Sequence, residues 1–201
     1  MSRTDKREHL IDVAIDLFNQ HGYHATGVDR IMEATGISKA TLYRHFNTKD
    51  DLIVAVLAKI DEAAREEMRA FVENASADPR ERILATFSQL AIWLEDQSFA
   101  GCPFMAAASE FGGGPNVVLQ QVQMHKRLYL AFFEELTRAA KIPDPKTVAR
   151  QLVMLHEGAV AFAQVLGSKG VAENARKAAE AVLDRAVHAP TAPGSPAIAS
   201  G

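Results

Sequence analysis

The stretch that most constrains the fold is residues 26–52, TGVDRIMEATGISKATLYRHFNTKDDL. It predicts two short helices separated by a tight turn, because Gly36 can adopt the positive φ favoured just after a helix C-terminus. Ser38 can cap the second helix, since its hydroxyl accepts from free N–H groups of the first turn. Thr48 and Asp51 then form a capping-box pair. We therefore predict a helix-turn-helix followed directly by a longer helix.

The second helix of this unit should present a polar outer face. Helical spacing turns Leu42, and Phe46 one turn later, towards the core. The remaining side chains include the cations and hydroxyls that bind phosphates and base edges in a DNA major groove. The candidate DNA contacts are Lys39, Ala40, Thr41, Tyr43, Arg44 and His45, flanked by Thr26 and Lys49 as phosphate contacts. The alternative interpretation is that these side chains only solvate an exposed helix face.

The same region carries a family resemblance. The motifs G-Y, T, G-I-S, T-L-Y, H-F and K-D-x-L occur in this order, after a helix that ends in LFNQHGYHAT. In this pattern the N-terminal part of the chain resembles the TetR family of bacterial transcriptional regulators. The resemblance implies a dimer whose first three helices bind DNA and whose variable helical C-terminal domain binds a releasing ligand. Gly27 departs from the pattern, because many members have a second hydroxyl residue there.

Composition limits the class of protein. With 201 residues and 48% hydrophobic content, the chain can bury a sizeable core, and its one cysteine cannot form an internal disulfide. The chain shows no signal sequence and no long apolar run, so we expect a cytoplasmic protein without membrane contact. The formal charge of −3 argues against an architectural protein that coats DNA electrostatically. DNA binding must therefore depend on a local patch of positive charge and on the shape of the binding surface.

Apolar residues recur at helical spacing through the whole chain, and no strand-like alternation occurs, so we predict an all-α fold. A basic segment that contains Arg3 and Arg7 precedes the first helix and could form an arm or a frayed end. We expect a three-helix helix-turn-helix DNA-binding domain at residues 1–48. A larger helical ligand-binding and dimerisation domain should cover 49–188, and a Pro/Ala/Gly/Ser-rich tail at 189–201 should be disordered.

The last two long helices predict a homodimer. Each has an apolar stripe with small residues, and two such pairs can form a symmetric four-helix seam. Two-fold symmetry implies a palindromic DNA operator. The stripes are Val148, Leu152, Leu155, Ala159, Phe162 and Leu166 on one helix, and Ala175, Ala178, Ala179, Val182, Leu183 and Ala186 on the other.

Aromatic, methionine and polar side chains gather in the C-terminal two-thirds of the chain. His125 and Tyr129 lie at i, i+4 on one helix, while His156 and Glu157 interrupt a helix that is otherwise apolar. Buried polar groups need partners, and a ligand pocket can provide them, although a filled core is the alternative. We predict that a small, largely apolar effector binds here and lowers DNA affinity. The candidate ligand contacts are Phe87, Trp93, Cys102, Phe104, Met124, His125, Tyr129, His156 and Phe162.

Cys102 raises an alternative, a regulator that senses oxidants or electrophiles through its thiol. Thiol reactivity needs a lowered pKa, and no Lys, Arg or His adjoins Cys102 in the sequence, so a buried structural thiol is favoured. An enzyme built on Cys102, His125 and Glu110 is disfavoured, because the chain has no nucleophile motif, cofactor fingerprint or local acid–base pair. We expect no cofactor. We also expect no metal ion, because no predicted helix contains His or Cys residues at the spacing of zinc ligands.

Overall fold

The computed structural model describes residues 3–188, and within that range every regular element is an α-helix, which confirms the predicted fold class. The predicted tail at 189–201 lies outside the described residues. The helices are α1 (Arg3–His21), α2 (Val28–Thr35), α3 (Lys39–His45), α4 (Lys49–Ala75), α5 (Pro79–Glu95), α6 (Pro103–Phe111), α7 (Val117–Ala139), α8 (Pro145–Leu166) and α9 (Val171–His188).

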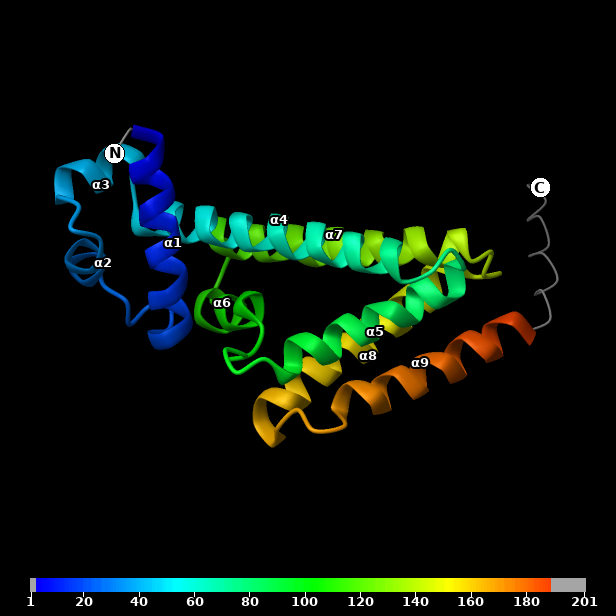
Figure 1. The fold of residues 1–201 in the computed structure, drawn as a ribbon. Helices are drawn as coiled ribbons and strands as arrows, with labels where there is room; N and C mark the ends of the chain where they lie inside the picture. Colours follow the sequence, from blue (N-terminus) through cyan, green and yellow to red (C-terminus); the bar gives the residue numbers. More distant parts are fainter. Residues whose placement is uncertain (1–2, 189–201) are drawn as a thin grey trace, which may run out of the picture.

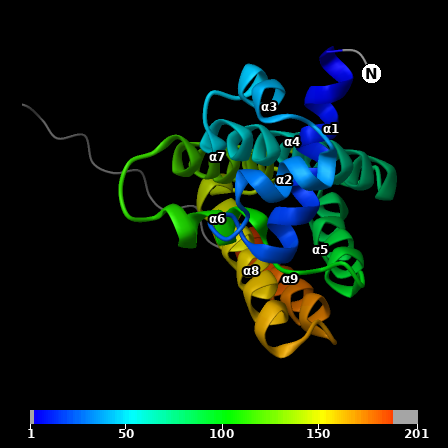
Figure 2. The same cartoon turned by 90° about the vertical axis from the view of Figure 1, so that its left-hand side faces the viewer.

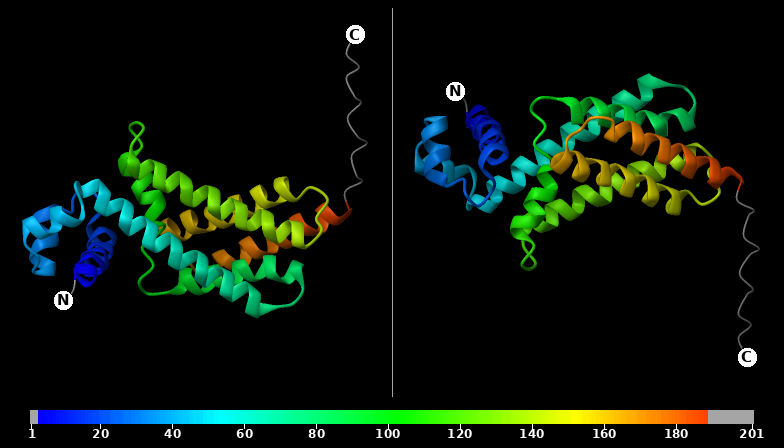
Figure 3. Two further views of the ribbon diagram at one scale, coloured as in Figure 1. Left: turned by 90° about the horizontal axis from the view of Figure 1, so that it is seen from above. Right: turned by 90° about the horizontal axis from the view of Figure 1, so that it is seen from below.

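The helices form a small lobe and a large lobe that α4 connects (Figure 1). The small lobe contains α1, α2 and α3, which lie together at the left end of the molecule in Figure 1, the side that faces the viewer in Figure 2. From there α4 runs along the large lobe beside α7, α5 and α8 pack under this pair, and α9 packs against α5 and α8. The views from above and below show α4 crossing from one lobe to the other (Figure 3). The short helix α6 lies between the lobes.

The local signals in the helix-turn-helix form as predicted. Gly36 has a φ of 67° at the end of α2, and the Ser38 hydroxyl accepts a hydrogen bond from the first turn of α3. Thr48 and Asp51 make both hydrogen bonds of a capping box at the start of α4. Because these caps satisfy backbone groups that have no partner within their helices, they fix where each short helix begins and ends.

The basic N-terminal segment does not form an arm, because α1 already begins at Arg3. The guanidinium carbon of Arg7 lies 5.3 Å from the ring centroid of Phe46, at the end of α3, in cation–π geometry. This contact joins the first turns of α1 to α3 and gives Arg7 a packing role.

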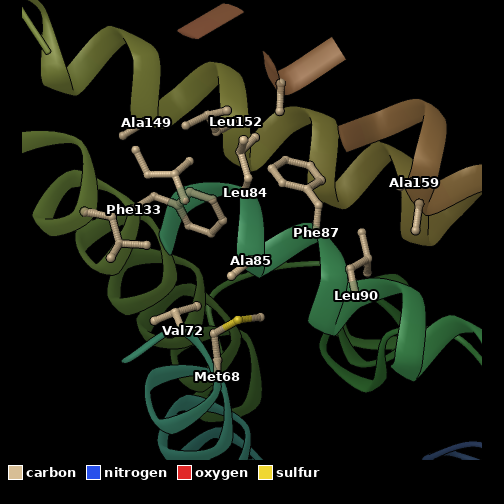
Figure 4. Packing of buried hydrophobic residues seen from close by; sticks show 14 of the residues in the cluster. Met68, Val72, Leu84, Ala85, Phe87, Leu90, Phe133, Ala149, Leu152 and Ala159 are labelled. Carbon is tan, nitrogen blue, oxygen red and sulfur yellow. The ribbon is translucent and has the colours of Figure 1, made fainter. Parts of the chain in front are cut away.

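Two clusters of buried hydrophobic residues stabilise the lobes. In the large lobe, Phe87 of α5 and Phe133 of α7 pack with Leu152 of α8 and Met68 of α4 (Figure 4). The second cluster joins α1, α2 and α3 to the first half of α4, and it also includes Phe104 and other residues of α6 and α7. The core of the small lobe therefore continues into the large lobe through α6 and α7.

Most of the predicted dimer stripe is internal. Leu152 of α8 and Leu183 of α9 are fully buried within the single chain, because α8 packs against α5, α7 and α9. Of the predicted stripe, Phe162 and Leu166 are exposed, at 55% and 69%. Val165, at 79%, and Met154, at 65%, extend this exposed apolar face, although we did not predict them. The stripe residues mainly build the core of one protomer.

Candidate DNA-binding surface and ligand cavity

The outer face of α3 carries most of the predicted DNA contacts. Lys39, Ala40, Tyr43 and Arg44 are exposed, whereas Leu42 is fully buried and anchors the helix to the small lobe. Thr41 and His45 lie one turn apart on the same side of the helix, and both are half-buried. The face therefore combines two cations, hydroxyl groups and a small residue on a helix at the outer edge of the molecule (Figure 2).

Thr26 does not face outwards, which corrects its prediction as a phosphate contact. It is fully buried, and its hydroxyl donates to the backbone oxygens of Gly22, at 2.8 Å, and Leu17, at 3.2 Å. Its single proton is thus used to close the turn after α1. Lys49 is half-buried, and its Nζ donates to the His24 backbone oxygen at 3.3 Å, so it also helps to hold that turn.

Glu110 of α6 binds the turn between α1 and α2. Its carboxylate oxygens accept from the backbone nitrogens of Tyr23, at 2.9 Å, and His24, at 2.6 Å. The His24 ring Nε2 lies 2.9 Å from the Glu110 backbone oxygen, and the Tyr23 hydroxyl donates to the Pro103 backbone oxygen at 3.1 Å. Hydrogen bonds to a carboxylate are stronger than neutral ones. We call this set of contacts the Glu110 clamp.

A cavity of about 540 Å³ lies in the large lobe, lined by residues of α1, α4, α5, α6, α7 and α8 and by the segment before α6. This volume is within the usual range for small-molecule sites. Most of the predicted ligand contacts line it, namely Trp93, Cys102, Phe104, His125, Tyr129 and His156.

Three predicted ligand contacts do not line the cavity. Phe87 is 1% exposed and belongs to the packed core, where its ring centroid lies 5.5 Å from that of His156. Met124 and Phe162 are about half exposed on the outside of α7 and α8. Met124 precedes His125, which faces inwards, and one residue turns the side chain by about 100° around a helix. The residue types at these three positions predicted ligand contacts, but the position of each residue on its helix places the side chain in the core or on the outer surface.

A buried, hydrogen-bonded pair of Asp61 and His125 lies at the cavity, with His125 in its lining. Asp61 of α4 is 4% exposed, and its Oδ1 lies 2.7 Å from Nδ1 of His125 on α7. Its Oδ2 accepts from Nε of Arg65 at 3.0 Å. The His125 ring stacks on the Phe104 ring of α6, with centroids 3.5 Å apart. We did not predict Asp61, although an acid within the apolar repeat of α4 is a signal that could have identified it.

Two further polar pairs join α7 to α8 beside the cavity. The Tyr129 hydroxyl lies 3.0 Å from Nδ1 of His156, and Nζ of Lys126 lies 2.7 Å from both carboxylate oxygens of Glu157. Lys126 Nζ is also 3.9 Å from the Cys102 sulfur. The fold thus brings to Cys102 a cation that does not adjoin it in the sequence.

Burial controls the ionisation of these groups. It raises the pKa of the Tyr129 hydroxyl well above its usual value and lowers the pKa of His156 from 6.5 to about 4. It also lowers the pKa of His125, although hydrogen bonding to Asp61 acts in the opposite direction. Burial raises the pKa of Cys102 more than Lys126 lowers it, so the thiol stays protonated and the environment does not favour a reactive thiolate.

Comparison with known proteins assigns the family. A family model described as "Bacterial regulatory proteins, tetR family" matches residues 10–56, and one described as "Tetracyclin repressor-like, C-terminal domain" matches residues 79–179. This protein belongs to the TetR family. The resemblance in the N-terminal motifs is confirmed, and family membership extends through the large lobe.

Several relatives are described as transcriptional regulators. A crystal structure of a TetR-family transcriptional regulator from Streptomyces coelicolor is 30% identical and covers 91% of this chain and 96% of its own, with a TM-score of 0.84. The HTH-type transcriptional regulator YjdC of Escherichia coli is 21% identical over 89% of this chain and 93% of its own length. The HTH-type transcriptional activator FasR of Mycolicibacterium smegmatis is 31% identical, but the match spans 49% of this chain and 44% of FasR.

This TetR-family protein is therefore a transcriptional regulator whose helix-turn-helix binds DNA. Effector-responsive repressors are typical of the family. None of the helices within residues 3–188 is both long and apolar enough to span a membrane. In the same range, His, Cys, Asp and Glu side chains form no cluster of three that could hold a metal ion.

The buried histidine His156 predicts a pH dependence of stability. Its folded-state pKa of about 4 lies below the unfolded value of 6.5, so the unfolded state binds more protons between these pH values. The free energy of unfolding should therefore fall as pH decreases from 6.5 to 4, by up to about 3 kcal/mol from this residue. His156→Gln should flatten the slope in denaturant titrations, whereas His21→Gln, at an exposed position, should not. An unchanged slope in His156→Gln would contradict this assignment.

Proposed function

We propose that this TetR-family regulator is a repressor that binds a palindromic operator as a homodimer and leaves it when a small molecule occupies the large-lobe cavity. The observation that carries the proposal is the position of α6. Its first turn lines the cavity through Pro103 and Phe104, and its last turn holds the helix-turn-helix through the Glu110 clamp. One short helix thus contacts both functional parts.

In this proposal the outer face of α3 contacts the operator. Lys39 and Thr41, near the N-terminus of the recognition helix, donate to base edges, while Tyr43 and Arg44 bind phosphates. Ala40 lets the helix backbone approach the groove. His45 and Lys49 contribute to register, although both are half-buried and Lys49 already bonds the His24 carbonyl. Lys49 retains two further N–H groups for a phosphate.

The exposed apolar face of α8 supports the homodimer. Met154, Phe162, Val165 and Leu166 are each more than half exposed, and such a concentration of large apolar side chains is unusual on a monomer surface. In a two-fold dimer, α8 and α9 of each protomer would bury this face against the partner's copy. The dimer contact proposed here shares only Phe162 and Leu166 with the stripe predicted from the sequence and adds Met154 and Val165.

Effector release then requires that occupancy moves α6 or α4. The cavity is lined by Ile60, Ala64 and Met68 of α4, which continues directly into the small lobe, and by Phe104 of α6. A molecule that displaces Phe104 shifts α6, and with it the carboxylate that holds the α1–α2 turn. Operator affinity falls only if the effector binds the released state more tightly, and a tenfold loss needs about 1.4 kcal/mol of difference.

The recognition face can be tested with an operator selected from random duplexes. Lys39→Ala should weaken binding by about 1–3 kcal/mol and relax the preference at one base position, because a base contact is lost. Tyr43→Ala should weaken binding to all sequences alike. Lys169→Ala removes an exposed positive charge from the large lobe and serves as the control. If selection enriches no site, or if Lys169→Ala weakens binding as much, the proposed face is wrong.

The dimer contact can be tested by placing a charge on α8. Phe162→Glu should convert the dimer to a monomer in light scattering at micromolar concentration, because the charge would be buried against its symmetry mate. Ile92→Glu changes a residue of similar exposure, 60%, on α5 and should leave the dimer intact. Circular dichroism should show equal helix content in both variants. A monomeric wild-type protein would exclude this arrangement.

The Glu110 clamp can be tested without an effector. In Glu110→Gln the amide keeps one acceptor but places an NH₂ group against a backbone N–H, so the α1–α2 turn loosens. Operator affinity should fall by about threefold to tenfold, which corresponds to a loss of about 1 kcal/mol of hydrogen bonding. Glu95→Gln removes an exposed carboxylate at the end of α5 and should have no effect. Equal operator affinity in wild type and Glu110→Gln would show that the clamp does not control DNA binding.

A further inference from the structure

The hydrogen-bonding groups of the cavity wall indicate the chemistry of the effector. Nδ1 of His125 faces Asp61 Oδ1 at 2.7 Å, and a carboxylate can only accept, so the ring proton resides on Nδ1. Nε2 of this neutral ring therefore keeps its lone pair. His125 is 8% exposed and lines the cavity. Its unused nitrogen is an acceptor that needs a donor from a bound molecule.

Tyr129 provides a second acceptor. Its hydroxyl lies 3.0 Å from Nδ1 of His156, and Nε2 of that buried ring has no hydrogen-bond partner among the described residues. Whichever of the two groups carries the proton between them, the Tyr129 oxygen keeps a lone pair that can accept from a ligand. Both His125 and Tyr129, on this part of α7, can therefore accept a hydrogen bond from a molecule in the cavity.

The charged residues around the cavity also favour some ligands over others. Cations are outnumbered by carboxylates, so a bound anion would be repelled, while a neutral or cationic molecule would not. The carboxylates that line the cavity are Glu66, Glu67, Glu135 and Glu157, and the lining cations are Arg65 and Arg69. Asp61 and Lys126 do not line it but pair with the lining residues His125 and Glu157. The apolar part of the wall is mainly aromatic and includes Trp93, Phe99, Phe104 and Phe132.

We infer that the effector is a neutral or cationic aromatic molecule with a hydroxyl or amino group that donates hydrogen bonds to His125 Nε2 and the Tyr129 oxygen. The inference rests on the proposed function in one respect, that a molecule in this cavity is the regulatory ligand. It excludes carboxylates and other anions, and it excludes purely hydrocarbon molecules, which would leave both acceptors unsatisfied in a buried site. The aromatic ring lies against Phe104 and Trp93, and the donor lies towards α7.

A set of probes that differ only in one substituent tests this inference. Naphthylmethanol and naphthylmethylamine carry a donor, the methyl ether of naphthylmethanol does not, and naphthoate is an anion. Binding can be followed at neutral pH through the fluorescence of Trp93, the single tryptophan of the chain, which lines the cavity. The alcohol and the amine should bind at least about tenfold more tightly than the ether and naphthoate, as one satisfied buried hydrogen bond predicts.

Two variants test whether His125 and Tyr129 cause the tighter binding of probes that carry a hydrogen-bond donor. His125→Phe keeps a ring to stack on Phe104 but removes the acceptor, so it should bring the alcohol to the affinity of the ether. Tyr129→Phe removes the second acceptor and provides the same test if His125→Phe does not fold. If the ether or naphthoate binds as tightly as the alcohol, or if no probe binds saturably, the inference is wrong.

Operator binding, measured separately with each probe, distinguishes this inference from the proposed function. A donor preference without DNA release would support the inferred chemistry and contradict the proposed regulatory role of the cavity. Release by naphthoate in preference to the alcohol would contradict the inferred chemistry and leave the proposed role intact.

Discussion

The hydrogen bonds from two consecutive backbone N–H groups to the Glu110 carboxylate connect the small lobe to the large one. Tyr23 and His24 follow Gly22, just after α1, so their N–H groups have no partner within a helix, and Glu110 satisfies both. Each is a charge-assisted bond, and together with the contact of Tyr23 with Pro103 they fix the turn to α6. This contact adds to α4 and to the hydrophobic core that the small lobe shares with α6 and α7.

The cavity contains buried polar groups that a purely structural core would not need. A buried carboxylate such as Asp61 is costly unless cations and hydrogen bonds surround it, and Arg65 and His125 supply them. The same pairs fix the orientation of the His125 ring, which Phe104 then covers. Because Phe104 belongs to α6, the polar wall and the Glu110 clamp are joined by one rigid helix. This arrangement gives a bound molecule a short physical path to the helix-turn-helix.

The structural features that could be predicted from the sequence are those that depend on interactions between residues close in the chain. Gly36, Ser38 and Thr48 fix helix ends through contacts within a few residues, so their roles could be derived without a structure. The outer face of α3 followed from the same helical periodicity. Six of the nine predicted ligand contacts line the cavity, because polar residues inside apolar helices are visible in the sequence.

Features that depend on packing between distant segments could not be derived. The hydroxyl of Thr26 turns inwards because two carbonyls at the end of α1 lie near it, and Glu110 meets residues more than eighty positions away. The apolar stripes of α8 and α9 face the core because three helices surround α8, which periodicity alone does not show. Asp61 and His125 meet only when α4 and α7 lie side by side.

Hydrogen exchange at the backbone amides of Tyr23 and His24 tests most directly whether the cavity controls the turn. Cys102 is the single cysteine and lines the cavity, so benzyl methanethiosulfonate in excess would place an aromatic group there by a mixed disulfide. Cys102→Ser, treated in the same way, is the matched control. The account predicts that labelling speeds exchange at both amides and lowers operator affinity. A labelled protein that loses operator affinity while both amides exchange as slowly as in the control would contradict it.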